Sequence, residues 1–198
     1  MKKNCELTCN LCKPPAKIVK KKKSPLDIFS ETFKYLKKEY LCDFEVDECD
    51  WINQPFDDTA DWSVGRNHNG PAKGFKSSKG YLYLAPSIYE GYYANLLLPW
   101  QLILPDGVTS VGKMCMHFMY VMNDGKITVS QRGTPTSRNK FPPTVIKFKV
   151  ENPTLEWKHA AVDVMVTDSF ELVLKGIKGV RASYLAIDYL FFTKGGCY

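Results

Sequence analysis

The stretch CDFEVDECDWINQPFDDTADW, residues 42–62, sets the expectations for the rest of this chain. Cys42 and Cys49 stand seven residues apart and bracket a predicted tight turn. The stretch holds no Lys or Arg, and it carries eight carboxylates: Asp43, Glu45, Asp47, Glu48, Asp50, Asp57, Asp58 and Asp61. Like charges this close repel one another unless water, distance or a cation separates them. We therefore expect either a solvated acidic loop or the first strand of a domain tied together by a metal ion.

The composition is that of one folded domain with an appendage. A chain of 198 residues with 44% hydrophobic content can bury one good core. The 13% aromatic content favours β structure. The net charge of +6 arises in residues 1–41, which hold eleven Lys against four acidic residues, whereas the remainder is nearly neutral. The basic charge therefore belongs to a tail, and we expect no nucleic-acid partner.

Seven cysteines are many for an intracellular protein of this size. They form a cluster of three, a close pair and a distant pair: Cys5, Cys9 and Cys12, then Cys42 and Cys49, then Cys115 and Cys197. The sequence has no apolar run long enough for a transmembrane helix and no signal peptide at its start. We therefore expect an extracellular chain, secreted or from an ectodomain, that is a piece of a longer protein. The odd cysteine count favours the same interpretation.

Residues 1–12 contain three cysteines in the spacing C-x3-C-x2-C. A zinc knuckle would need a fourth ligand, and the first histidine is as distant as His68. The segment resembles the end of a ShKT domain, a module similar to sea-anemone toxins. The resemblance implies that these cysteines pair with upstream cysteines that this chain lacks. We therefore expect Cys5, Cys9 and Cys12 to be unpaired or mispaired.

Two short segments separate this end from the main domain. Residues 13–23, KPPAKIVKKKK, predict an extended linker within a disordered basic tail. Residues 24–41 predict a short helix, with Ser24 at the N-cap and Pro25 at the first helical position. Apolar residues then recur every three or four positions: Phe29, Phe33, Leu36 and Tyr40. We expect this stripe to pack against the following domain.

From Cys42 onwards the apolar pattern has the period of a β-strand. Val162, Val164 and Val166, for example, alternate with residues that would point the other way. The clearest runs are 81–84, 94–98, 116–122, 127–131, 146–150, 162–166, 170–174 and 185–191. Short strands with turns about every ten residues predict an all-β, antiparallel sandwich. We expect four tryptophans to fill it: Trp51, Trp62, Trp100 and Trp157.

With these runs in view, residues 42–197 resemble a MAM domain, an extracellular module of adhesion receptors and secreted metalloproteases. The matching motifs follow the family's order: CDFEVDECDW at the start, Asp57-Asp58…Asp61-Trp62, GYLYLAP at 80–86, ANLLLPWQL at 94–102, CMHFMYVMNDGKITV at 115–129, EWKHAAVDV at 156–164 and YLAIDYLFFTKGGC at 184–197. The resemblance implies a jelly-roll β-sandwich. It also implies the disulfides Cys42–Cys49 and Cys115–Cys197.

The resemblance further implies a cation held between the start and the end of the domain. The residues that match the family's acidic positions are Glu45, Asp57 or Asp58, and Asp188. Calcium takes about six to eight oxygen ligands, several of them carboxylates, so we expect calcium or another cation here. The sequence departs from the family at Tyr189, where a second Asp usually follows, and it carries one extra residue between Asp57 and Trp62.

No catalytic motif stands out in the sequence. The histidines His68, His117 and His159 are isolated, and neither H-E-x-x-H nor G-x-S-x-G occurs. We therefore expect a non-catalytic extracellular module that mediates adhesion or protein association, with itself or with another extracellular protein. Loop 65–79 is the expected recognition loop, with Arg66, His68 and Lys73 as candidate binding residues. The alternatives are an accessory domain of a secreted astacin-like zinc protease and a carbohydrate-binding module.

Overall fold

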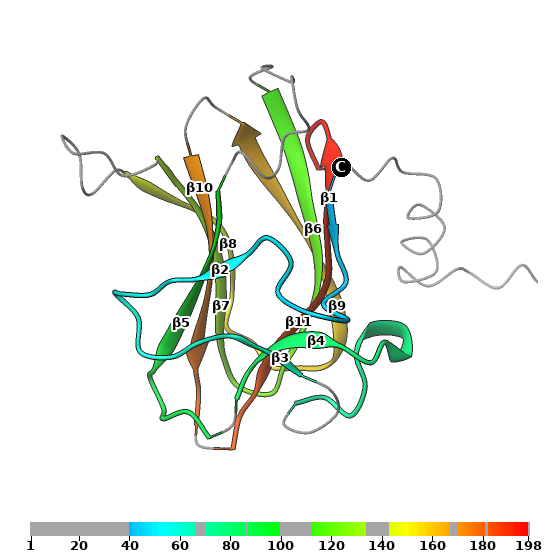
Figure 1. The fold of residues 1–198 in the computed structure, drawn as a ribbon, viewed down its shortest axis with the longest axis vertical. Coiled ribbons are helices and arrows are strands. Elements are labelled where there is room, and N and C mark those ends of the chain that lie inside the picture. Colours follow the sequence, from blue (N-terminus) through cyan, green and yellow to red (C-terminus); the bar gives the residue numbers. More distant parts are fainter. Residues whose placement is uncertain are drawn as a thin grey trace, which may run out of the picture. The chain divides into compact units, whose positions relative to one another are not determined.

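Figure 1 shows the computed structural model, which describes residues 40–65, 70–85, 87–99, 112–133, 143–166, 170–180 and 182–197. Within these ranges the chain forms strands and one short 3-10 helix, η1 (Phe75–Ser77). The predicted ShKT-like end and linker lie outside the described residues, and so does the predicted helix up to residue 39. The predicted end of that helix is wrong, because Tyr40 and Leu41 belong to a strand, β1 (Tyr40–Cys42). Pairing with a neighbouring strand overrides the helical spacing of Tyr40.

The first sheet of the sandwich has six strands. Its order is β3-β4-β11-β6-β9, and β1 pairs with β11. The bounds are β3 (Ser63–Gly65), β4 (Tyr81–Leu84), β11 (Leu185–Lys194), β6 (Gly112–Met122) and β9 (Thr154–Val166). The strand β9 forms one edge of this sheet, because β6 is its only neighbour in the strand order.

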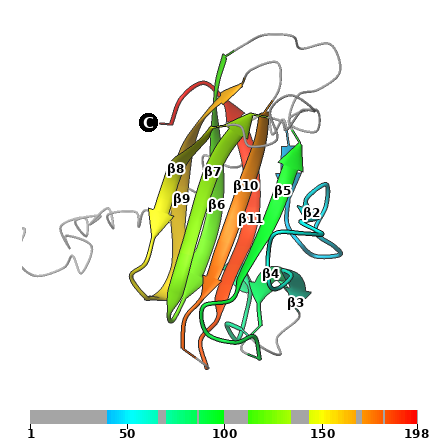
Figure 2. The same ribbon diagram turned by 90° about the vertical axis from the view of Figure 1, so that its left-hand side faces the viewer.

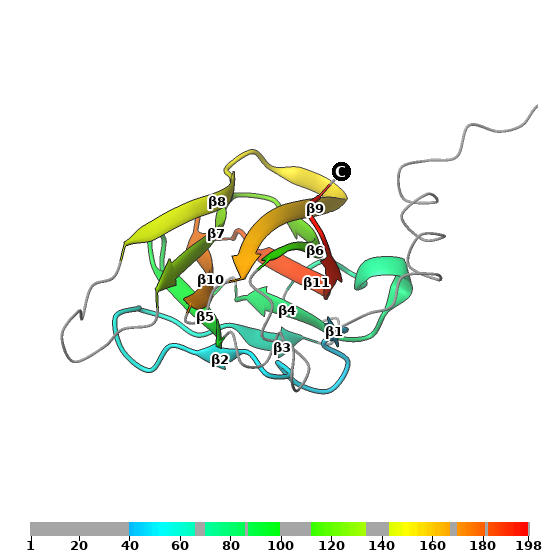
Figure 3. The same cartoon turned by 90° about the horizontal axis from the view of Figure 1, so that it is seen from above.

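The second sheet has five strands in the order β2-β5-β10-β7-β8. The bounds are β2 (Ile52–Asn53), β5 (Tyr93–Pro99), β10 (Phe170–Lys178), β7 (Gly125–Gly133) and β8 (Thr144–Val150). The order is visible across the face of this sheet in Figure 2, and Figure 3 shows the two sheets as facing layers. All strand pairs are antiparallel, and every run predicted from alternation lies in a strand. The predicted antiparallel jelly-roll sandwich is therefore confirmed.

The core lies between the two sheets. In β9 the residues Val162, Val164 and Val166 are buried, as their alternation predicts. Trp62 is buried across the strand β10, where a Cβ on Gly176 would come within 2.5 Å of the indole Cζ2. Gly176 therefore makes room for the ring, and the Nε1–H of Trp62 donates to the Ala94 carbonyl at 3.2 Å.

The other tryptophans have different positions. Trp51 is buried in the core as expected, whereas Trp157 lies partly buried in a second apolar cluster with Tyr81 and Tyr83. Trp100 lies outside the described residues. The filling role predicted for the tryptophans is thus confirmed for Trp51 and Trp62.

Both disulfides implied by the family resemblance are present. Cys42–Cys49 closes the turn that follows β1, with an S–S distance of 2.00 Å. Cys115–Cys197 joins β6 to the segment after β11, with an S–S distance of 1.95 Å. The backbone N–H of Cys197 also donates to Oδ1 of Asp163 on β9, at 2.7 Å. The end of the chain is therefore fastened to two strands of the first sheet.

Candidate functional site

The acidic stretch divides between two places in the fold. Its second half, the loop between β2 and β3, lies against β5, where the backbone N–H of Asn95 donates to Oδ2 of Asp58 at 2.8 Å. Burial is the main factor that raises the pKa of Asp58, and the charges of Asp61 and Asp57 raise it further. Asp57 has a left-handed backbone conformation, with φ of 69°, and its side chain is exposed. Asp58 therefore holds this loop against β5 of the second sheet.

Asp188 lies instead on the outer face of the first sheet, at a bulge in β11. The register of β11 against β6 shifts between Asp188 and Phe191, and Tyr189 within the shift has φ of 53°. Asp188 is fully buried. Its Oδ2 accepts from the backbone N–H of Phe75 at 2.7 Å and from the hydroxyl of Ser78 at 2.6 Å. Its Oδ1 is buried and has no hydrogen-bond partner within the part of the chain that the structure describes.

Desolvation dominates the electrostatics of Asp188. Burial raises the pKa of this carboxyl to about 7, and the hydrogen bonds from Ser78 and Phe75 offset only part of that rise. The charge of Glu45 raises the same pKa further, which places the two carboxylates near each other. One oxygen of Glu45 accepts from the backbone N–H of Lys79 at 3.0 Å. The two acids therefore accept hydrogen bonds from the same loop, residues 74–80.

The structure thus brings together two of the four predicted cation ligands and separates the other two. Glu45 acts on the pKa of Asp188, whereas Asp58 responds to Asp61, Asp57 and Lys175. Among the described residues no group of three or more His, Cys, Asp or Glu side chains is arranged to hold a metal ion. The unpaired Oδ1 of Asp188 is nevertheless a suitable oxygen ligand beside a second carboxylate, so calcium binding stays a prediction.

The predicted recognition loop is held against the outer face of the first sheet. Phe75 is buried, and its ring meets the Tyr189 ring edge to face with their centres 6.2 Å apart. The Nε1–H of Trp157 donates to the backbone carbonyl of Lys73 at 3.2 Å, while the Lys73 side chain is exposed. Arg66 and His68 lie outside the described residues. Of the three candidate binding residues, the structure describes only Lys73.

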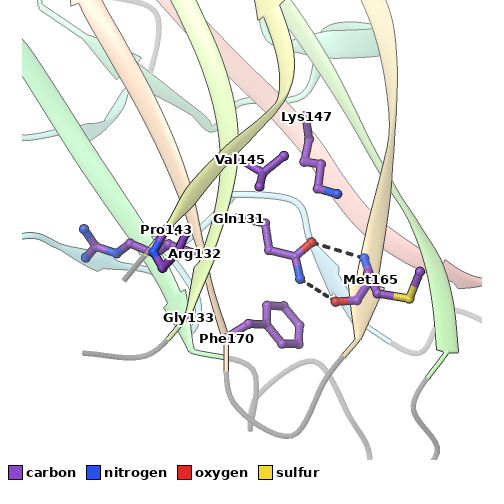
Figure 4. A pocket seen from close by; sticks show the side chains of 8 residues that line it. All are labelled: Gln131, Arg132, Gly133, Pro143, Val145, Lys147, Met165 and Phe170. Carbon is purple, nitrogen blue, oxygen red and sulfur yellow. Dashed lines mark hydrogen bonds between the residues drawn. The ribbon is translucent and has the colours of Figure 1, made fainter. Parts of the chain in front are cut away.

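A feature that the sequence did not indicate lies where the edge strands β8 and β9 face each other. A pocket of about 240 Å³ opens there, lined by residues that include Gln131, Pro143, Val145, Lys147, Met165 and Phe170. Figure 4 shows Gln131 reaching across from β7 to the backbone of Met165 on β9. The amide of Gln131 donates to the Met165 carbonyl, and its Oε1 accepts from the Met165 N–H at 3.2 Å. This side chain therefore closes the base of the gap between the two sheets.

Two exposed apolar side chains line this pocket, Val145 with an exposed fraction of 53% and Met165 with 39%. The same two strands expose Ile146, to 63%, and Leu155 at the other end of β9, to 90%. We call these four residues the β8–β9 flank. Val145 and Ile146 pair in regular register with Gln131 and Ser130, and the register shift between β8 and β7 follows them. The two side chains therefore point to opposite faces of β8, and both are exposed. The run 146–150 predicted this strand without indicating an apolar surface.

Comparison with known protein families assigns the β-sandwich to a family. The family described as "MAM domain, meprin/A5/mu" matches residues 42–198. The chain belongs to the MAM domain family. MAM domains are non-catalytic extracellular modules that mediate protein interactions, and the two disulfides fit that compartment. In the described ranges no helix is long and apolar enough to cross a membrane.

Solved structures share the fold of this MAM domain at low sequence identity. The CBM22-2 xylan-binding domain of Paenibacillus barcinonensis Xyn10C is 12% identical, with a TM-score of 0.56 over 79% of this chain and 99% of that chain. A cleaved adhesin domain of Lys-gingipain from Porphyromonas gingivalis is 15% identical, with a TM-score of 0.50 over 79% of this chain and 98% of that chain. At such identities the likeness establishes the jelly-roll fold alone.

One expectation about side chains in the MAM domain is wrong. The histidines looked isolated, but Nδ1 of His117 on β6 lies 3.1 Å from Nε2 of His159 on β9. The two residues are 42 positions apart in the sequence. Only the pairing of β6 with β9 brings them together, so their spacing carried no signal.

Proposed function

We propose that this MAM domain is a non-catalytic adhesion module that associates with another extracellular protein, or with itself, through the β8–β9 flank. The observation that carries the proposal is the apolar surface around the pocket between two edge strands. Edge strands in soluble proteins are usually protected by charges or covering loops, because exposed apolar edges associate. Lys147 and Lys149 provide part of that protection, yet Val145 and Ile146 beside them are exposed.

The physical gain from covering the flank is the removal of apolar surface from water. Burial contributes roughly 25 cal/mol per Å² of apolar surface, so several half-exposed aliphatic side chains supply a meaningful share of an interface. The flank also offers a concave site, since the pocket lies beside Val145 and is floored by the Gln131 amide and the buried Phe170. Binding hot spots are typically apolar anchors that fill such pockets.

A charge placed on the flank is expected to abolish association. Val145→Lys puts an ammonium at the mouth of the pocket, where a partner would have to desolvate it, so we expect at least a tenfold loss of binding. The matched control is Val180→Lys, because Val180 is exposed to 56% and Val145 to 53%, yet Val180 lies between β10 and β11. Beads coated with the full chain would report self-association by clustering. Fluorescent multimers of the chain on intact cells would report another partner.

The two variants make the outcome decisive. Loss of clustering or cell binding with Val145→Lys, and retention with Val180→Lys, supports the flank. Equal binding by wild type and Val145→Lys would refute it, as would the same loss in both variants.

A second candidate function is carbohydrate binding. Its structural support is an exposed aromatic pair, Tyr89 and Tyr92, whose ring centres are 5.4 Å apart before β5. Exposed aromatic faces can stack on sugars, as they do on other flat apolar ligands. The xylan-binding domain named above shares the fold, which by itself assigns no ligand. A glycan array probed with wild type and Tyr89→Ala separates this function from protein association.

The chain could also serve as an accessory domain of an astacin-like zinc protease. Such a protease would carry H-E-x-x-H in a separate catalytic domain, so the transcript that encodes this chain decides this alternative. Presence of the motif upstream would make the flank a candidate contact with the protease or its substrates.

We also propose that Asp188 and Glu45 contribute ligands to a calcium ion. Millimolar calcium is expected to raise the melting temperature of the wild-type chain at pH 8, where the Asp188 carboxyl is ionised, and a chelator should reverse the shift. Asp188→Asn should abolish the shift, because an amide is a weaker ligand for a divalent cation. Asp58→Asn is the matched control and should retain it, since Asp58 lies against β5. An unchanged melting temperature in wild type would refute the calcium site.

A further inference from the structure

The pair His117 and His159 lies on the outer face of the first sheet, next to the Cys115–Cys197 disulfide. In the pairing of β6 with β9, His117 is opposite Ala161 and His159 is opposite Met119. Residues two apart on a strand point to the same face, so the two histidines are diagonal neighbours on that face. His117 is half-buried, whereas His159 is exposed and accessible to a hydrated ion.

The two imidazole rings meet edge to edge. Their planes differ by only 7°, and their centres are 5.3 Å apart. The facing nitrogens, Nδ1 of His117 and Nε2 of His159, are 3.1 Å apart. The nitrogens are closer than the centres by about the sum of the two ring radii, so the rings lie nearly in line. A hydrogen bond along this N···N line requires one nitrogen to carry the proton and the other to offer its lone pair.

Neighbouring side chains fix the orientation of His117. Its ring stacks on Phe191 with centres 4.5 Å apart and planes 11° apart. Its Nε2 lies 3.2 Å from Oγ1 of Thr193. When Nε2 carries the proton and donates to that hydroxyl, the lone pair is on Nδ1 and faces His159. A metal-bound histidine commonly donates its other N–H in this way, which fixes the tautomer.

We propose that His117 and His159 form a two-nitrogen site for a divalent transition-metal ion such as Zn²⁺. Nδ1 of His117 and Nε2 of His159 would be the ligands, and water would complete the coordination. Zinc–nitrogen bonds of about 2.0–2.1 Å in tetrahedral geometry place two ligand nitrogens about 3.3 Å apart. The observed 3.1 Å is close to that separation. Because the two nitrogens face each other in line, each ring has to turn by roughly 40° for its lone pair to point at an ion beside the N···N line. The shared proton then moves to Nδ1 of His159, and no net proton is released when both rings start neutral.

The protonation state favours this site at neutral pH. Burial lowers the pKa of His117 to about 4. Desolvation of its imidazole beside His117 lowers the pKa of His159 to about 4, and the charge of His117 lowers it further, although part of the side chain stays exposed to water. Both rings are therefore neutral at pH 7, which is the form that binds metals. Imidazole nitrogen suits zinc, copper and nickel, whereas calcium prefers oxygen, so this site is distinct from the one proposed at Asp188.

The test is a zinc titration of the full chain at pH 7.5, in competition with a chromophoric chelator. Cys5, Cys9 and Cys12 are first replaced by Ser in every protein, because thiolates at the start of the chain also bind zinc. We expect one zinc ion per chain in this parent. His159→Ala should lower the affinity at least tenfold, and His159→Gln should do the same. His68→Ala is the matched control, since it removes the third histidine, and it should leave the affinity unchanged.

Side-chain ¹⁵N spectra provide a second, independent readout. Zinc should shift Nδ1 of His117 and Nε2 of His159, with smaller effects on their other nitrogens. His159 is exposed, so its variants are expected to keep the wild-type melting temperature. The site is overturned when the parent binds no zinc up to millimolar concentration. It is also overturned when the His159 variants bind as tightly as the parent, or when His68→Ala causes the loss.

Discussion

Removal of the Cys115–Cys197 disulfide is expected to lower the free energy of unfolding by about 4–5 kcal/mol. The two cysteines are 82 residues apart, and the stabilisation by a disulfide grows with the length of the loop that it closes in the unfolded chain. Cys115→Ala with Cys197→Ala removes the bond without leaving a buried thiol. Urea denaturation of the full chain under non-reducing conditions measures the change.

The other disulfide supplies the matched control for this experiment. Cys42 and Cys49 are only seven residues apart, so Cys42→Ala with Cys49→Ala should cost about 2.5 kcal/mol. The ratio of the two losses tests loop length directly, because both pairs are removed by the same substitution. Equal losses of unfolding free energy in the two double variants, or a larger loss at Cys42–Cys49, would contradict the dependence on loop length.

Asp188 is expected to make the domain less stable as the pH rises from about 4 to 8. The folded chain keeps the carboxyl protonated up to about pH 7, whereas an unfolded Asp loses its proton near pH 4. Between these values the folded state binds the proton more tightly, so the free energy of unfolding falls with increasing pH. The raised pKa corresponds to a loss on the order of 4 kcal/mol, complete above pH 7.

Asp188→Asn isolates this effect, because Asn keeps an acceptor oxygen for Ser78 and Phe75 and cannot ionise. His117 and His159 act in the opposite direction, since their lowered pKa values make unfolding more favourable at low pH. The quantity to measure is therefore the difference between variant and wild type. In the presence of a chelator, the variant should gain on the order of 4 kcal/mol relative to wild type between pH 4 and pH 8.

An exposed acid serves as the control for the pH experiment. Asp50 is exposed, so Asp50→Asn should follow the wild-type profile over this range. Parallel pH profiles for wild type and Asp188→Asn would show that Asp188 does not carry the proton. Urea denaturation at five or six pH values is sufficient.

The sequence predicted the sandwich because its signals are local. Alternation in β9 and β10 reports which side of a strand faces the core, and that side depends only on neighbouring residues. The helix assigned to Tyr40 failed for the opposite reason. Tyr40 pairs with Phe192, which is 152 positions further along the chain, and no local sequence pattern reveals such a partner.

The candidate sites depended on contacts between distant residues. The acidic stretch predicted one cation site, but the fold places Asp58 against β5 and Glu45 beside Asp188. The reason is that Cys42–Cys49 and the turn within it direct the first half of the stretch to the first sheet. The second half continues through β2 to the second sheet.

The sequence by itself determined the fold class, the family resemblance and, through that resemblance, both disulfide pairings. Each of these rests on patterns or motifs that are read along the chain. The tertiary structure alone decided the β8–β9 flank, the contact of His117 with His159, and the division of the acids. These features come from strand register and from which edges are left uncovered, and both are set by how the two sheets pack together.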